Sequence, residues 1–117
     1  MAQTTTMYCG DEKKFAIELT APGFNIDTDD WDLEVASPHA KVEAQKGAST
    51  DDLMIFYETV TPEQGEAYKQ WYAIVDTTKL IKGQLVVTAT AHIPDANASG
   101  GIRNETAKYV LGTLNAK

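Results

Sequence analysis

The sequence has a single cysteine, few basic residues and no long hydrophobic run. With Cys9 alone, an intrachain disulfide and a four-cysteine zinc site are excluded, so the fold must be stabilised by packing. No stretch approaches the about 18 apolar residues of a membrane-spanning helix, and the first residues lack the apolar segment of a signal peptide. We therefore expect synthesis in a cytoplasm and no membrane partner.

Basic residues are too few to favour nucleic-acid binding. Ten Lys and Arg residues stand against 17 Asp and Glu residues, which gives a formal net charge of −7. A surface of this sign repels phosphate backbones unless its cations are gathered on one face. We expect no nucleic-acid partner, and we expect the acidity to keep the protein soluble when many copies crowd together.

The length fits one domain, because 117 residues suffice for one hydrophobic core. Residues 1–11 are small and polar and include three consecutive threonines. This composition predicts a flexible or partner-docked N-terminal arm that lies outside the core. Residues 12–117 are predicted to form the domain itself.

Apolar and polar residues alternate with a period of two along most of the chain, which is the pattern of half-buried β-strands. Strands are expected at 14–20, 31–37, 41–45, 52–60, 67–77, 84–93 and 102–114. Turn signals separate them, and no amphipathic segment is long enough for a regular helix. The sequence therefore predicts an all-β fold, an antiparallel immunoglobulin-like β-sandwich of about seven strands, with a small barrel as the alternative.

Two segments have distinctive local patterns. Strand 52–60 carries large apolar side chains on both faces, so it is expected to be covered on both sides. In residues 77–83, Asp76 or Thr77 is expected to cap a single helical turn that buries Leu80 before Gly83. Such a turn commonly connects two sheets.

No pattern of catalytic, cofactor-binding or metal-ligating residues stands out, and we expect the protein not to be an enzyme and to need no cofactor. The carboxylates at 27, 29, 30 and 32 approach a calcium-loop spacing, but Trp31 takes a ligand position and no glycine follows. We interpret these aspartates as turn caps. His39 and His92 lie 53 positions apart, in no local metal or catalytic spacing.

Six aromatic residues in the middle of the chain allow two interpretations. A sandwich of this size needs large core side chains, and aromatic rings also stack on sugars. The set is Trp31, Phe56, Tyr57, Tyr68, Trp71 and Tyr72. A carbohydrate or host-surface binding module that uses exposed aromatics such as Trp71 or Tyr68 is therefore the alternative function.

The C-terminal half resembles small β-domain virion proteins of tailed bacteriophages and prophages that infect Bacteroides-type bacteria, including crAss-like phages. The resemblance lies in a D-T-[ST]-x-L pattern, a glycine, an alternating strand, an I-P-D sequence, a variable loop and a G-I-R-x-E sequence. The matching residues are Asp76, Thr77, Thr78, Leu80, Gly83, Ile93, Pro94, Asp95, Gly101, Ile102, Arg103 and Glu105. Residues 15–35 match more loosely.

The resemblance implies a structural protein of the virion, produced in the host cytoplasm, that decorates or stabilises the capsid or anchors a fibre as a head-fibre or tail-fibre adaptor. Its partners would be other capsid or fibre subunits in a multi-copy assembly. Pro94 ends a strand, and Gly100 and Gly101 permit unusual backbone angles, so the loop after Ile93 can hold an irregular shape. We therefore expect a partner-binding surface made of Pro94, Asp95, Gly100, Gly101, Arg103 and Glu105.

Overall fold

The computed structural model describes residues 6–116, which form eight strands and two short 3₁₀ turns. The strands are β1 (Met7–Tyr8), β2 (Glu12–Ala16), β3 (Asp30–Ser37), β4 (Ala40–Gln45), β5 (Leu53–Val60), β6 (Tyr68–Asp76), β7 (Gly83–Pro94) and β8 (Ile102–Asn115). The turns are η1 (Thr77–Lys79) and η2 (Ser99–Gly101). This part of the chain has no α-helix, and none of its helical segments is long and apolar enough to cross a bilayer.

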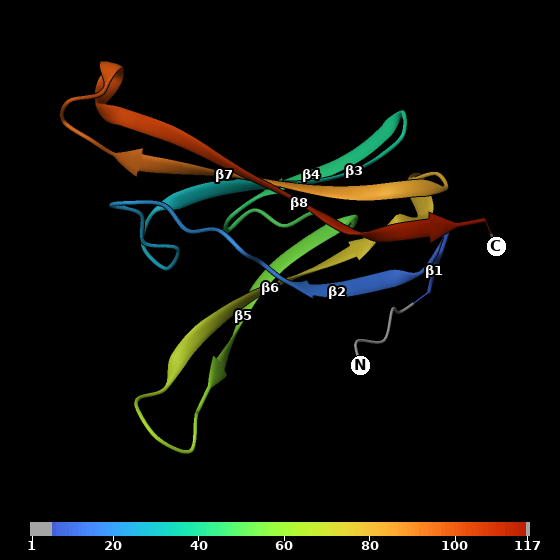
Figure 1. Ribbon diagram of the computed structural model, residues 1–117, viewed down its shortest axis with the longest axis horizontal. Coiled ribbons are helices and arrows are strands. Elements are labelled where there is room, and N and C mark those ends of the chain that lie inside the picture. The colour runs from blue at the N-terminus through green and yellow to red at the C-terminus, as the bar shows by residue number, and fades with distance from the viewer. Residues whose placement is uncertain (1–5, 117) are drawn as a thin grey trace.

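The strands form two sheets. Sheet A has the order β1-β8-β7-β3-β4 and sheet B the order β2-β6-β5 (Figure 1). All neighbours pair antiparallel except β1, which runs parallel to β8. The all-β prediction is confirmed. The seven predicted strands correspond to β2 through β8, and the eighth is β1.

Strand alternation determines the core. On β7, every second residue from Leu85 to Ile93 is buried, and the residues between them face away from the core. Between the sheets, Trp31 of β3 meets Trp71 of β6 edge to face, with ring centroids 5.5 Å apart. Removing a buried ring of this size typically costs about 3–5 kcal/mol. These two rings therefore make a major contact between sheet A and sheet B.

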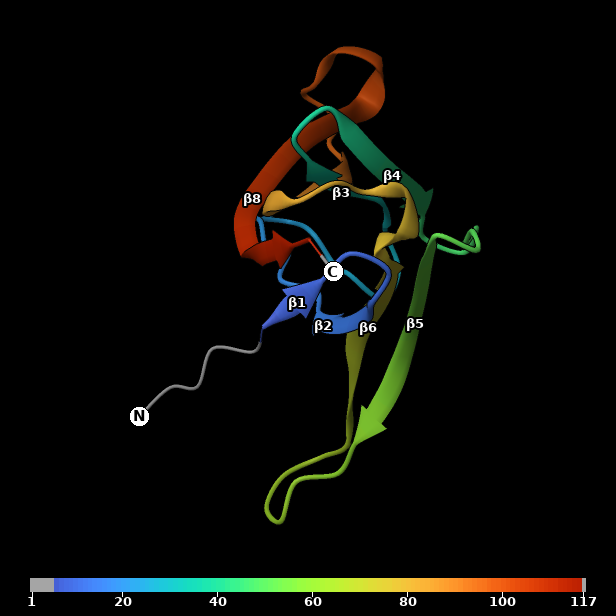
Figure 2. The same cartoon turned by 90° about the vertical axis from the view of Figure 1, so that its right-hand side faces the viewer.

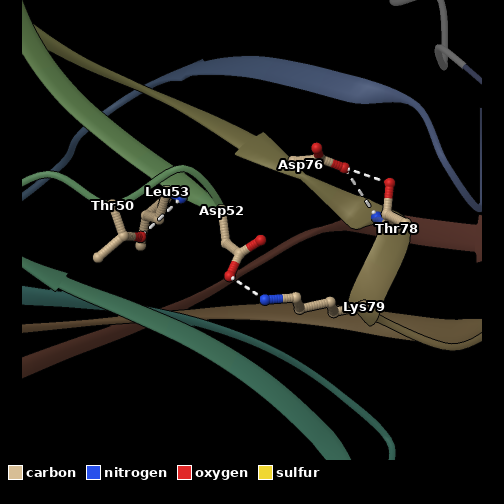
Figure 3. Close-up of polar contacts among 6 residues, drawn as sticks. All are labelled: Thr50, Asp52, Leu53, Asp76, Thr78 and Lys79. Atoms are coloured by element: carbon tan, nitrogen blue, oxygen red, sulfur yellow. Dashed lines mark hydrogen bonds and ion pairs between the residues drawn. The ribbon is translucent and has the colours of Figure 1, made fainter.

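The connection from sheet B to sheet A is made by η1, as the sequence predicts (Figure 3). The Asp76 carboxylate accepts hydrogen bonds from the Thr78 backbone N–H, at 2.9 Å, and from the Thr78 hydroxyl. These bonds lower the pKa of Asp76, the one from the hydroxyl most. Leu80 follows and is buried. The turn is closed further by an ion pair between Lys79 and Asp52, at 2.9 Å.

Gly83 begins β7 where no side chain fits. Its φ is +132°, and a Cβ atom there would lie 2.6 Å from Cγ of Pro38. Pro38 lies in the tight turn between β3 and β4. Glycine is therefore required for β7 to pass this turn.

The predicted N-terminal arm extends too far into the chain. Residues 1–5 lie outside the described residues, but Met7 and Tyr8 pair with Leu114 and Asn115 of β8. The Met7 side chain is buried and lies over Gly112, where a Cβ atom would come within 2.5 Å of Met7 Cε. A long apolar side chain opposite a glycine is the physical reason that Met7 belongs to the core, whereas the Tyr8 side chain is exposed and only its backbone pairs with β8.

The predicted strand at 14–20 is also too long. Its pairing with β6 ends at Ala16, after which the backbone leaves sheet B. Ile17 and Leu19 remain buried, and the Tyr109 hydroxyl of β8 lies 3.4 Å from the Glu18 backbone nitrogen and 3.5 Å from the Ala16 carbonyl oxygen. The Ile17 N–H still donates to the Trp71 carbonyl of β6 at 2.9 Å, and alternation continues to Leu19 because the segment lines the core.

Beyond Trp71 and Tyr57, β5 and β6 continue as a two-stranded hairpin, here called the β5–β6 arm (residues 58–70). It projects away from sheet A (Figure 2). Most of its side chains are exposed. A ribbon of two strands has little burial of its own to stabilise it.

Candidate interaction surface

The middle of the outer face of sheet B is apolar. Register places Met54 of β5 beside Ile74 of β6, and Phe56 beside Tyr72 in the next row. The Phe56 and Tyr72 rings stack with centroids 6.0 Å apart. Met54 is 52% exposed, and the other three are half-buried. These four residues are here called the sheet B patch.

Lys14 and Glu58 cross this patch. The Lys14 ammonium lies 4.5 Å from the centroid of the Tyr72 ring and 5.5 Å from that of Phe56. It also forms an ion pair with Glu58 at 2.9 Å. Both charged side chains are close to half exposed, so the pair contributes little stability in water. The Lys14 stem covers part of the aromatic surface, and the rest of the patch faces solvent.

The outer face of sheet A is different, since it carries the side chains expected of a sheet face in water. Polar or charged residues occupy most of its registered positions. They are Asp32, Glu34, Lys41, Glu43, Thr88, Thr90, His92, Asn104, Thr106 and Lys108. One outer face is therefore adapted to solvent, and the other resembles a surface meant to be covered.

A signal for the sheet B patch is present in the sequence, because strand 52–60 has large apolar residues on both faces. Leu53 is buried in the core, and Met54 and Phe56 face outward. The expected cover on the second side is absent among the described residues, apart from the Lys14 side chain. The pattern predicted a strand covered on both sides, and the predicted partner-binding residues lie instead around the loop after Ile93.

That loop is ordered by its own hydrogen bonds. The Asp95 backbone N–H donates to the Gly101 carbonyl at 3.0 Å, and the Ala98 N–H donates to the Asp95 carbonyl at 3.1 Å. Gly100 and Gly101 have φ angles of +76° and +78°, in the region that favours glycine. Pro94 is the last residue of β7. The loop is thus a preformed turn.

Arg103 connects the loop to the rest of the molecule. Its guanidinium donates to the Asp95 carboxylate at 3.1 Å and to the Pro22 carbonyl at 2.8 Å, and it pairs with Glu105. The Asn97 backbone N–H and then Arg103 lower the pKa of Asp95. In the structure Arg103 and Glu105 are paired with each other. The six predicted partner-binding residues therefore lie together at one end of the β7–β8 hairpin.

His92 is held between two oxygen atoms on the outer face of sheet A. Its Nδ1 lies 2.8 Å from Asn104 Oδ1, and its Nε2 lies 2.8 Å from Asp32 Oδ2. The bond to Asn104, and then the bond to Asp32, raise the pKa of His92 above 6.5. The arrangement favours the imidazolium, in which both nitrogens donate.

The aspartate-rich turn is fixed by protein groups. Trp71 Nε1 donates to Asp27 Oδ1 at 2.7 Å, and the Lys46 ammonium donates to the carbonyls of Asp27 and Asp29, at 2.8 and 2.9 Å. The Asn25 N–H donates to the Asp29 carboxylate at 2.9 Å. Within residues 6–116, no three His, Cys, Asp or Glu side chains gather as a metal site would need. Asp27 and Asp29 therefore stabilise the turn, whereas Asp30 and Asp32 belong to β3, where Asp32 bonds His92.

The six aromatic residues divide between core and surface. Trp31 and Trp71 are buried, so the expectation that Trp71 is exposed is wrong: it lies under Tyr57, with ring centroids 5.2 Å apart. Tyr68 is 52% exposed, on the β5–β6 arm. Tyr57 borders a shallow groove of about 390 Å³.

The free edge of β5 is partly closed. The Ser49 hydroxyl donates to the Ile55 carbonyl at 3.2 Å and accepts from its N–H at 2.8 Å, and Thr50 does the same for Leu53 through its backbone. By alternation, the N–H and C=O groups of Tyr57 point to the same edge, where the described residues provide no partner. An edge that opens toward the β5–β6 arm can accept a strand.

Comparisons of the chain with protein-family models, with curated proteins and with solved structures gave no match.

Proposed function

We propose that the protein is a structural subunit of a bacteriophage virion, a non-catalytic β-domain that decorates or stabilises the capsid or anchors a fibre through protein–protein contacts. The observation that carries the proposal is the sheet B patch. Met54, Phe56, Tyr72 and Ile74 lie on the outer face of a sheet whose opposite face already forms the core. Contiguous apolar surface of this kind is characteristic of a protein interface.

Two further features support an assembly role. The loop formed by Pro94, Asp95, Gly100 and Gly101 is rigid before any partner binds, which lowers the entropic cost of association. The resemblance to phage virion proteins includes this loop and the Asp76–Leu80 turn. In the structure the turn is a connection between sheets, so the resemblance at these positions supports a shared fold.

We also propose that the fold is a variant of the immunoglobulin-like sandwich. The order of hydrogen-bonded strands in sheet A, β8-β7-β3-β4, corresponds to strands G-F-C-C′ of an immunoglobulin domain. The order in sheet B, β2-β6-β5, corresponds to strands B-E-D. Trp31 lies on the strand that corresponds to C, where immunoglobulin domains carry a buried tryptophan. The loop after Ile93 then corresponds to the F–G loop, one of those with which variable domains bind. The single cysteine means that packing replaces the inter-sheet disulfide.

On this proposal the protein resides in the virion after synthesis in the host cytoplasm, in many copies, with other capsid or fibre subunits as partners and with neither nucleic acid nor membrane among them. The net charge of −7 agrees with that exclusion.

Mass spectrometry of purified particles tests the proposal, together with negative-stain images of particles made with and without the protein. We expect the chain in intact particles, and Phe56→Ser to reduce its incorporation while Thr88→Ser, on the outer face of sheet A, leaves it unchanged. Intact particles that never contain the chain would refute the proposal.

A carbohydrate or host-surface binding module is the second candidate, and Tyr57 favours it. This ring is 48% exposed, lies on Trp71 beside the groove, and has the Lys69 ammonium 4.6 Å from its centroid. Titration with host glycans should then change the fluorescence of Trp71, and Tyr57→Ala should abolish the change. An unchanged spectrum with every glycan would exclude this candidate.

A further inference from the structure

The register of sheet B gives the patch an internal symmetry. Lys14 pairs with Ile74 across β2 and β6, and Glu58 pairs with Gln70 across β5 and β6. On β6, Tyr72 lies halfway between Ile74 and Gln70, and β6 itself is the central strand. Tyr72 is therefore at the midpoint between the backbone positions of Lys14 and Glu58.

A two-fold axis lying in the plane of a contact relates two facing copies. It moves a residue of one copy to the position at the same distance on the other side of the axis, in the second copy. An axis that passes over Tyr72, perpendicular to the line from Lys14 to Glu58, would place each of these residues opposite the other in a second copy. The same operation brings Phe56 over Ile74 of the second copy. Opposite charges would then meet at two places, and apolar side chains would meet between them.

We propose that a second copy of this chain covers the outer face of sheet B, related by a two-fold axis over Tyr72, with Lys14 of each copy paired to Glu58 of the other. The proposal rests on the proposed function, because it names the partner of the same patch.

Charge favours this occupant. Two chains that each carry −7 repel one another over most of their surfaces. At the sheet B patch one cation, Lys14, and one anion, Glu58, already form an ion pair at 2.9 Å, while the next outward-facing row beyond Lys14 and Ile74 holds Glu12 and Asp76. Exchange of Lys14 and Glu58 between copies keeps both of these charges paired as the apolar contact forms.

The size of the patch indicates a weak contact. From Met54 to Val60, β5 extends about 20 Å at about 3.4 Å per residue, and three strands spaced about 4.8 Å apart add about 10 Å of width. A face of these dimensions covers a few hundred Å², less than the roughly 800 Å² per partner of a typical stable complex. We expect a dimer with a dissociation constant of about 10 µM or weaker, reinforced by multiplicity in the particle.

Charge reversal with sedimentation velocity tests this arrangement, with the purified chain at about 10 µM to about 1 mM. Lys14→Glu places like charges opposite each other twice and should weaken dimerisation at least about tenfold. Adding Glu58→Lys to the same chain restores both pairs and should return the dissociation constant to within about threefold of the original. Lys41→Glu is the matched control, because Lys41 pairs with Glu34 at 3.5 Å on the outer face of sheet A. It should leave dimerisation unchanged.

A thermal melt of each variant establishes that it is folded. A wild-type chain that stays monomeric at the highest concentration would overturn the second copy as occupant. So would a charge-reversed double variant that associates no better than Lys14→Glu, which would indicate a different protein as partner. In both cases the particle experiment with Phe56→Ser decides the proposed function separately, because it detects any partner of the patch.

Discussion

A buried threonine at the junction of the two sheets offers a sharp test of the fold. The Thr77 side chain is completely buried. Its hydroxyl donates to the Asp11 carbonyl at 2.7 Å and accepts from the Gly10 N–H at 2.9 Å. It therefore connects the start of β2 to the turn that follows β6, across more than 60 residues of sequence.

Replacing Thr77 by valine keeps the shape of the side chain and removes both bonds. A hydrogen bond contributes about 1 kcal/mol net, and a buried group left without a partner costs about 1–3 kcal/mol. The Asp11 carbonyl retains its bond from the Thr77 N–H, at 3.0 Å, which limits the loss. We expect Thr77→Val to lower the free energy of unfolding by about 2–3 kcal/mol. Each kcal/mol lost should lower the melting temperature by about 4 °C.

Two other substitutions separate the hydroxyl from the packing. Thr77→Ser keeps the hydroxyl and loses one methyl group, at about 1 kcal/mol. Thr59→Val changes an exposed threonine of β5 and should stay within about 0.5 kcal/mol of the original protein. Urea unfolding followed by tryptophan fluorescence measures all three variants. The slope of the unfolding free energy against urea concentration should be the same for each of them. If Thr77→Val were as stable as Thr77→Ser, the hydroxyl bonds would not be what stabilises this junction.

Three further results are expected. The pKa of His92 is raised by Asn104 and Asp32, so its contribution to stability is complete below about pH 6.5 and is lost as the pH rises through the folded-state pKa. The free energy of unfolding measured across that pH range should show this loss, and His92→Gln should remove the pH dependence. Gly83→Ala should destabilise the fold by about 2 kcal/mol or more, because its Cβ meets Pro38, and an unchanged urea midpoint would contradict this. Limited proteolysis should cut the β5–β6 arm first, as sequencing of the fragments would reveal.

Local pattern was sufficient to predict most of the fold. Alternation identified β3 to β8 closely, and the cap at Asp76 identified η1, because both depend on residues near one another in sequence. β1 was missed, because two residues contain no period and its burial depends on Gly112, more than 100 positions away. The strand after Lys14 was overextended, since burial alternates as far as Leu19 although the last backbone bond to β6 is made by Ile17.

The candidate site was predicted less completely. The sequence placed the six loop residues at one end of a hairpin, but the contact of Arg103 with Pro22 joins residues 81 positions apart and leaves no local pattern. The sheet B patch was visible only as two apolar faces on one strand. Alternation indicates that a side chain is to be covered, and it does not say by what.

The pairing of β1 with β8 has a consequence for how the protein forms. Leu114 and Asn115, the strand partners of Met7 and Tyr8, are synthesised more than 100 residues after them. At a synthesis rate of about 20 residues per second, Met7 spends several seconds without its site beside Gly112. During that interval the edge of sheet A where β1 pairs with β8 is incomplete in every nascent chain. Chains translated side by side on one messenger RNA therefore have time to exchange β1 before each chain pairs its own β1 with its own β8.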